Sequence, residues 1–386
     1  MSATGRPGAS SSAPAPSEDA DEGSAAAPAR REREPPDPDA ARAKRRRTRL
    51  RIALFGALIL ATLTLLIVLG HPDRLWSRVR HGQASWLALA AGVEVISLLG
   101  YALSFHVLVG EGTERMSRRF SLEVTFAGVV ATKLIAAFGA GGVALNVWAL
   151  RAAGLAPREI AERIVSLMVT LYAVFMAALL LTALGLWSGI LAGSAPTALT
   201  LIPALIGVAF VLSAAALLRA PMGVARALKR ASRMRRPFGP AARLAGGAVD
   251  AGRRGMVRAV RAVRDHPQGL VGAILYWGCD ATALWASVHA FGSPPALDGV
   301  IVSYFVAQLL GALPVPGGVG VVDGGLAGAL IAFGASGTLA VVGVITYRFI
   351  SYWLPTIPGA IAYASLLRRV EAWRQADEPE PAAVEA

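Results

Sequence analysis

The sequence has little charge, few aromatic residues and one cysteine. Only 16% of its 386 residues are charged and 7% are aromatic, whereas 55% are hydrophobic. A soluble domain usually has about 25% charged residues, so this composition excludes a chain of ordinary soluble domains. The lone Cys279 excludes a disulfide framework and a multi-cysteine metal site, and we expect a buried, inert thiol there.

Familiar catalytic motifs are missing as well. The sequence contains no Walker A loop, no GxSxG, no HExxH and no CxxC. We therefore expect no metal, no cofactor and no soluble catalytic domain. This favours a transporter over an enzyme and leaves an intramembrane transferase as the alternative.

Acidic residues are scarce in the middle of the chain. Of the 25 acidic residues, 8 precede Arg49 and 5 follow Arg369. The apolar region between them predicts an all-α polytopic membrane protein, since about 20 apolar residues in a helix cross the hydrocarbon layer. The expected spans are Ile52–Gly70, Ala84–Val109, Val165–Ser188, Ala198–Leu218, Gly269–Phe291 and Thr338–Leu367.

Two further apolar stretches, Phe120–Leu150 and Leu297–Phe333, each contain a glycine-rich break. The breaks are Gly139-Ala140-Gly141-Gly142 in the first stretch and Pro314-Val315-Pro316-Gly317-Gly318 in the second. One interpretation makes each stretch a re-entrant hairpin, which gives six full spans and two hairpins. The other makes each an ordinary span with glycines that pack against neighbouring helices, which gives eight spans.

The placement of basic residues favours the hairpins. A single crossing by Phe120–Leu150 would put Arg151, Arg158 and Arg163 outside, against the positive-inside rule. With two hairpins, both termini lie in the cytoplasm, as does the loop 219–266 with its 13 Lys and Arg residues. We therefore expect a multi-pass protein of the plasma membrane.

The same topology divides the chain into parts. Residues 1–49 are predicted to be a disordered cytoplasmic tail, 50–367 the transmembrane domain and 368–386 a second cytoplasmic tail. A span–hairpin–span pattern covers about 84–188 and again about 268–367, in opposite orientation. This predicts an inverted-topology repeat, and paired helix breaks in two such halves indicate a substrate site near the midplane.

Ionisable residues inside the predicted spans are the candidates for that site, because charge is costly in lipid. Lys133 and Arg348 are cations suited to an anionic headgroup. Helix N–H groups after each glycine-rich break would add anion-binding donors. The predicted substrate-binding residues therefore include Lys133, Gly141, Gly142, Pro316, Gly317, Gly318 and Arg348.

Three acidic residues complete the candidate set. Glu94 and Asp280 fall at similar depths in the opening spans of the two halves. They would neutralise Lys133 and Arg348 in the absence of substrate, carry protons, or form purely structural ion pairs. Asp323 follows the second break, where a carboxylate stabilises the beginning of a helix, and it is also a functional candidate.

The basic loop contains an amphipathic stretch. Met256, Val257, Val260 and Val263 share one helical face, which arginines flank. This pattern predicts a helix lying on anionic lipid. Nucleic-acid binding is disfavoured, because aromatic stacking groups are nearly absent there.

Two segments resemble a known family. LPVPGGVGVVD (Leu313–Asp323) is similar to the PPPGGxGxxE stretch, and YRFISYWLP (Tyr347–Pro355) to the YRxxxYWxP stretch, of the lysylphosphatidylglycerol synthase transmembrane-domain family. Its members are also called flippase-like integral membrane proteins. Gly139–Gly154 is similar to the family's N-terminal glycine-rich segment, and the resemblance covers about residues 52–367.

The resemblance implies a helical bundle with re-entrant elements that moves aminoacylated phosphatidylglycerol between leaflets. It places Pro316, Gly317 and Gly318 at a hairpin tip and Arg348 in the substrate cavity, and Tyr352 of the same motif is a further candidate contact. Asp323 stands where the family usually has Glu. The sequence stops at residue 386 without a soluble aminoacyl-transfer domain, so we do not expect lysyl-lipid synthesis.

Taken together, these patterns favour a transporter of an anionic phospholipid or polyprenyl-phosphate lipid. One alternative is a membrane transferase that acts on a lipid-linked sugar or an aminoacyl lipid, with Asp323, Asp280 or Glu94 as base. Another is a scaffold for a separate synthetase or glycosyltransferase, docked through the basic loop. The lipid, the coupling ion and the oligomeric state stay open.

Overall fold

The computed structural model describes residues 82–110, 114–134, 140–190, 197–219, 239–311 and 320–377. All of them belong to the second of two units into which the chain divides, Met1–Arg51 and Ile52–Ala386. The predicted N-terminal tail, the predicted span Ile52–Gly70 and the predicted hairpin tip Pro316-Gly317-Gly318 lie outside the described residues.

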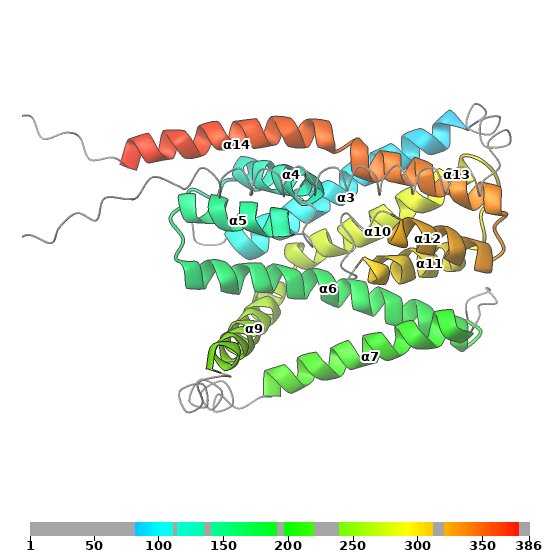
Figure 1. The fold of residues 1–386 in the computed structure, drawn as a ribbon, viewed down its shortest axis with the longest axis horizontal. Helices are drawn as coiled ribbons and strands as arrows, with labels where there is room; N and C mark the ends of the chain where they lie inside the picture. The colour runs from blue at the N-terminus through cyan, green and yellow to red at the C-terminus, as the bar shows by residue number, and fades with distance from the viewer. Residues whose placement is uncertain are drawn as a thin grey trace, which may run out of the picture. The chain divides into compact units, whose positions relative to one another are not determined.

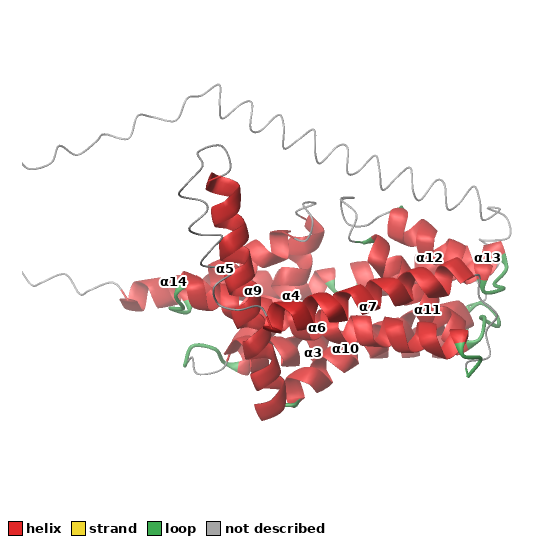
Figure 2. Cartoon of the chain, turned by 90° about the horizontal axis from the view of Figure 1, so that it is seen from below, coloured by secondary structure: helices red, strands yellow, loops and turns green. Residues whose placement is uncertain are grey.

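Regular structure in these ranges is helical throughout (Figures 1 and 2), which confirms the predicted all-α class. In chain order the helices are α3 (Ala84–Gly110), α4 (Arg118–Leu134), α5 (Ala140–Ala152), α6 (Pro157–Trp187), α7 (Thr197–Arg219), α9 (Gly239–Asp265), α10 (Gln268–His289), α11 (Leu297–Leu310), α12 (Val321–Ala332), α13 (Gly337–Arg348), the π-helix η2 (Phe349–Trp353) and α14 (Thr356–Asp377).

Four segments in the described ranges are helical, long and apolar enough to cross a membrane. They are Ala84–Gly110, Pro157–Trp187, Leu201–Arg219 and Gly337–Asp377. The predicted span Gly269–Phe291 forms α10 but is not among the four, because polar, aromatic and glycine residues lower its hydropathy. The C-terminal tail predicted from residue 368 begins as further turns of α14.

The two stretches with glycine-rich breaks are antiparallel helix pairs. In the first pair, Gly142 of α5 lies against Thr132 and Gly128 of α4. In the second, Gly325 of α12 lies against Leu310 of α11. The longest of these four helices, α4, has 17 residues and measures about 26 Å at 1.5 Å per residue, so none reaches across a hydrocarbon layer of about 30 Å.

Among the described helices, α3 and α10 make the most extensive contact. Small residues let the two backbones approach: a Cβ on Gly272 would lie 2.5 Å from the carbonyl oxygen of Gly100. Side-chain hydroxyls then bridge the helices. Ser97 Oγ donates to the carbonyl of Tyr276 and Ser104 Oγ to that of Gly269, both at 2.8 Å. Close packing and interhelical hydrogen bonds of this kind hold helices together in lipid.

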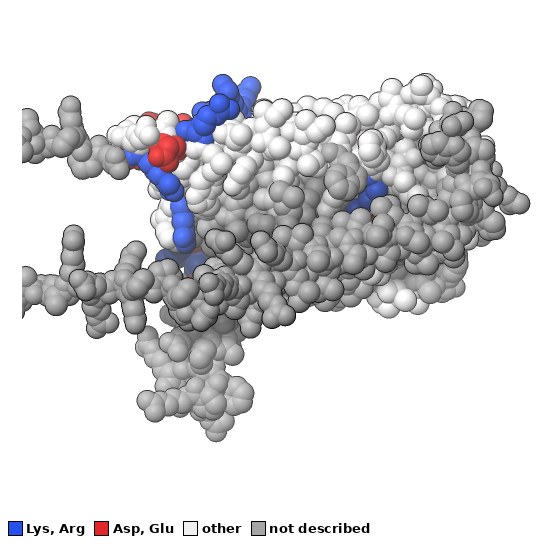
Figure 3. Space-filling view, turned by 45° about the horizontal axis from the view of Figure 1, so that its top comes forward, with Lys and Arg blue, Asp and Glu red and all other residues white. Residues whose placement is uncertain are grey.

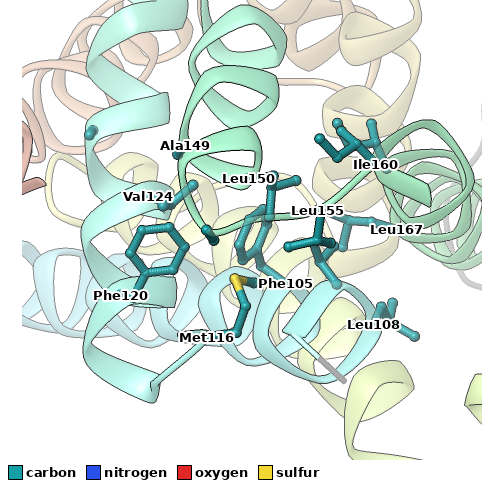
Figure 4. Close-up of a cluster of buried hydrophobic side chains, with 14 of the residues drawn as sticks. Phe105, Leu108, Met116, Phe120, Val124, Ala149, Leu150, Leu155, Ile160 and Leu167 are labelled. Atoms are coloured by element: carbon teal, nitrogen blue, oxygen red, sulfur yellow. The ribbon is translucent and has the colours of Figure 1, made fainter. Parts of the chain in front are cut away.

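Two hydrophobic clusters fill the bundle. The first lies among α3, α4, α5 and the beginning of α6 (Figure 4), where Phe105, Phe120 and Leu150 are fully buried. The second is built from α10 to α13, with Phe175 and Leu179 of α6. Leu366 and Val370 of α14 belong to the first cluster, so each cluster includes a helix from the other half of the chain.

The α3–α10 contact generates a stability prediction. Gly272→Ala should lower the thermal unfolding midpoint in detergent, because overpacking of this kind costs about 1–3 kcal/mol. Gly278→Ala, in the same helix, is the matched control, since a Cβ there meets nothing within 4 Å. If both variants melt at the wild-type temperature, the backbones of α3 and α10 do not approach each other as closely as described.

Candidate functional site

An ion pair joins the end of α13 to the beginning of α12. Arg348 is the last residue of α13, and its Nε donates to Oδ1 of Asp323 in the first turn of α12. The Asp323 side chain is 7% exposed and the Arg348 side chain 23%. Asp323 Oδ2 also accepts from the backbone N–H of Gly320 at 3.3 Å, which caps the helix. Asp323 thus stabilises the beginning of α12, as the sequence suggested, and pairs with Arg348; its functional role stays a prediction.

This contact does not use all of the hydrogen-bond donors of the Arg348 guanidinium. Its Nη2 is buried and finds no hydrogen-bond partner among the described residues. Buried donors are nearly always paired in native structures, so this one indicates an acceptor that the described residues do not supply. The chain enters the π-helix η2 directly after Arg348, and such segments are frequent at functional sites. Tyr352, in that π-helix, is half-buried.

Basic residues are concentrated at one end of the described surface. Figure 3 shows Lys and Arg gathered there, with a small blue spot away from that end. An arginine among apolar helices costs free energy unless it is paired or has a ligand.

A second polar cluster surrounds Asp280 of α10. Tyr304 of α11 donates its hydroxyl to Oδ2 at 2.5 Å, and Tyr347 of α13 donates to Oδ1 at 2.8 Å. Gln308 Nε2 donates in turn to the Tyr304 hydroxyl at 3.2 Å. Asp280 is 8% exposed, so these phenols replace the water that a carboxyl group would otherwise bind.

Glu94 of α3 joins this cluster from the other side. It is 4% exposed, and its carboxyl group lies next to the carboxyl group of Asp280. Tyr347 immediately precedes Arg348, so the Asp280 cluster adjoins the Arg348–Asp323 pair. The structure thus brings together Glu94, Asp280, Asp323 and Arg348. The direct partner of Arg348 is Asp323, however, whereas the sequence suggested Asp280 or Glu94.

The other candidates of the first half, Lys133, Gly141 and Gly142, form no described contact with this cluster. Lys133 lies in α4, and the position of its side chain is outside the described structure. Gly141 and Gly142 are buried at the beginning of α5, and the contact of Gly142 with Thr132 explains its lack of a side chain by helix packing. Their predicted role in substrate binding stays a prediction.

Sequence reasoning missed the aromatic and amide side chains of the site. Tyr304 and Gln308 carry no charge, and a single tyrosine in an apolar span is not an unusual feature. Tyr347 carried a signal, because it begins the YRFISYWLP segment that contains Arg348. Its hydrogen bond to Asp280 links that segment to α10.

A third polar cluster fastens α4 to α14. Glu123 accepts from Arg369 Nε at 2.7 Å and from Ser365 Oγ at 2.8 Å. Arg115, just before α4, pairs with Asp377 at 2.6 Å and lies over the Trp373 ring. Glu123 is 6% exposed and is held by these contacts.

Long apolar helices with buried ionisable groups between them define an integral, multi-pass membrane protein. A profile described as lysylphosphatidylglycerol synthase TM region matches residues 50–359, so the chain belongs to this family. A UPF0104 membrane protein of Methanothermobacter thermautotrophicus is 34% identical over 90 residues. That match covers 23% of this chain and 27% of the relative, so it spans about a quarter of the relative's length.

The Asp280 cluster gives a second stability prediction. Tyr347→Phe removes one of the two phenol donors to a buried carboxyl group and should lower the free energy of unfolding by about 1–3 kcal/mol. Thermal unfolding in detergent measures it. Tyr363→Phe, whose ring is on an exposed face of α14, is the control and should melt like the wild type. Equal melting of both variants would contradict the arrangement around Asp280.

Proposed function

We propose that this protein moves an anionic lipid between the two leaflets of the plasma membrane, with Arg348 as the headgroup contact. The observation that carries the proposal is the buried Nη2 of Arg348, which has no partner among the described residues while Nε is held by Asp323. A guanidinium with one edge held and another buried edge unpaired suits a phosphate oxygen.

The surroundings of Arg348 support an anion at this position. Asp323 marks the first turn of α12, where backbone N–H groups and the positive end of the helix dipole favour negative charge. In the absence of lipid, Asp323 supplies that negative charge. A phosphate that enters would bind Arg348 in place of, or beside, the Asp323 carboxylate, so that the guanidinium keeps a partner throughout the cycle.

The route across the membrane rests on a proposed inverted repeat. We assign α3, the α4–α5 pair and α6 to one half, and α10, the α11–α12 pair and α13–α14 to the other. The contacts support this assignment: α14 packs on α4, and α6 packs on α11, so the last helix of each half contacts the first helix of the other pair.

The two helix pairs are proposed to be re-entrant from opposite sides. Each of the four helices is too short to cross the hydrocarbon layer. Figures 1 and 2 place α4–α5 toward the left of the described helices and α11–α12 toward the right. With both termini cytoplasmic, the first pair enters from the cytoplasm and the second from outside. Rocking of the halves about the α3–α10 contact would then expose the site to each leaflet in turn.

The substrate class follows from the chemistry of the site. The family's name refers to the synthesis of lysylphosphatidylglycerol, and Arg348 requires only the phosphate that phospholipids and polyprenyl phosphates share.

A transferase would use the same carboxyl groups but would change the lipid chemically. Mass spectrometry of the lipid recovered after transport therefore separates the two activities, because the transporter leaves its lipid unchanged.

The proposed function predicts that Arg348→Ala slows leaflet transfer. The measurement uses purified protein in vesicles, with fluorescent phosphatidylglycerol and a fluorescent polyprenyl phosphate tested separately. Loss of a charge-assisted hydrogen bond should reduce transfer by about tenfold or more, and Arg348→Lys should keep part of it.

Arg374→Ala is the matched control, because this arginine lies in α14 with its side chain 63% exposed. It should transfer lipid at the wild-type rate. Transfer by Arg348→Ala at that same rate would overturn the role of Arg348, and absence of transfer of both lipids by the wild type would overturn the function.

The Glu94–Asp280 contact adds a proposal about protons. Two buried carboxyl groups that lie side by side repel each other when both are ionised, and this repulsion favours the binding of one proton by the pair. We therefore assign one bound proton to this pair. Its position beside the Arg348–Asp323 pair makes it the candidate for coupling lipid movement to a proton gradient.

Infrared spectroscopy tests this assignment without any transport assay. The wild-type protein at neutral pH should show the C=O band of a protonated carboxylic acid, and this band should be lost or shifted in Glu94→Gln and in Asp280→Asn. Glu371→Gln, which alters an exposed carboxylate of α14, should leave the band in place. A spectrum without the band in the wild type would exclude the shared proton.

A further inference from the structure

Helix α9 lies across the ends of two candidate membrane spans. Its Gly255 packs against Val165, near the beginning of α6, and its Gly252 lies close to Leu217, near the end of α7. Arg254 pairs with Glu162 of α6 at 2.5 Å. The beginning of α6 and the end of α7 are ends of candidate membrane spans. Because α9 contacts both of them, we place α9 at the membrane–water boundary.

The face of α9 that packs on the bundle contains Met256, Ala259 and Ala262, which are buried. The sequence pattern placed Met256 on a lipid-facing stripe with Val257, Val260 and Val263, and for Met256 this prediction was wrong. Val260 is 56% exposed. The reason is that alanines and glycines allow close approach to α6, so the small residues, and not the valines, form the buried face.

The opposite face of α9 carries both basic and apolar residues. At 100° per residue, Arg253, Val257, Val260, Arg261 and Arg264 share this face. Val260, Arg261 and Arg264 are exposed, and Arg253 and Val257 are partly exposed. We call these five residues the outer face of α9. Basic residues interleaved with apolar ones are typical of helices that lie in a lipid interface.

We propose that the outer face of α9 binds the headgroups of anionic phospholipids in the leaflet beside it. The arginines pair with phosphate, and Val257 and Val260 enter the boundary between headgroups and acyl chains. This binding surface is separate from the Arg348 site, and the inference does not depend on the proposed transport function.

Charge complementarity favours lipid as the partner. The loop 219–266 that contains α9 carries 13 Lys and Arg residues against Asp250 and Asp265. A hydrogen bond to Asp250 raises the pKa of Arg254, so this arginine stays charged while it fixes α9 on α6. No aromatic residue occurs between 239 and 265 to stack on a nucleic-acid base. The valines are suited to acyl chains and do not suit an acidic soluble protein.

The experiment places a spin label at residue 260. The native Cys279 is first replaced (Cys279→Ala), and Val260→Cys is labelled in the full-length protein, reconstituted into nanodiscs with or without phosphatidylglycerol. The accessibility of the label to oxygen and to a water-soluble nickel complex is then measured. Leu205→Cys on α7 and Ala376→Cys on α14 serve as lipid-facing and water-facing references, since both residues are exposed.

We expect the label at residue 260 to be protected from nickel at least about twofold more in anionic than in neutral nanodiscs. The double variant Arg261→Gln, Arg264→Gln should lose that difference, while the labels at 205 and 376 should not change with lipid charge. Nickel accessibility at 260 equal to that at 376 in both lipids would overturn the proposal. So would protection that appears only when an acidic protein or RNA is added.

Discussion

The described bundle depends on one constraint: a guanidinium that lies among apolar helices must keep an anionic partner. Arg348 meets this requirement through Asp323, and the same carboxylate caps α12. The end of α13 and the beginning of α12 are therefore held together by a contact that neither helix provides alone. Removing either partner would leave an uncompensated charge, which is far more costly than the pair itself.

The same constraint connects the polar clusters to the packing. Tyr347 precedes Arg348 and donates to Asp280, so the position of α13 is fixed against α10 as well as against α12. Asp280 in turn lies next to Glu94 of α3, and Gly100 and Gly272 bring the backbones of α3 and α10 together. Adjacent side chains thus link Arg348 to the α3–α10 contact. An anionic ligand that competes with Asp323 would act on this chain of contacts.

Composition and charge were sufficient to predict the class of protein and most of its helices, because apolar runs of membrane length have few alternatives. They also singled out Glu94, Asp280, Asp323 and Arg348 as candidates, since each is an ionisable residue in an apolar segment. The pairing among them was not predictable. Which carboxylate meets Arg348 depends on how α12 folds back on α11, and no local pattern encodes that. Met256 was wrongly placed on the lipid-facing stripe of α9 for a related reason: glycine and alanine count little as apolar residues, yet they decide where two helices approach.

The central claim is that Arg348 receives the anionic headgroup, and a density map of the protein in nanodiscs that contain the transported lipid tests it most directly. Our account predicts density for a phosphate within hydrogen-bonding distance of Nη2 of Arg348, next to the first turn of α12, in place of or beside the Asp323 carboxylate. A headgroup bound elsewhere in the bundle, with the Arg348–Asp323 pair intact, would contradict it.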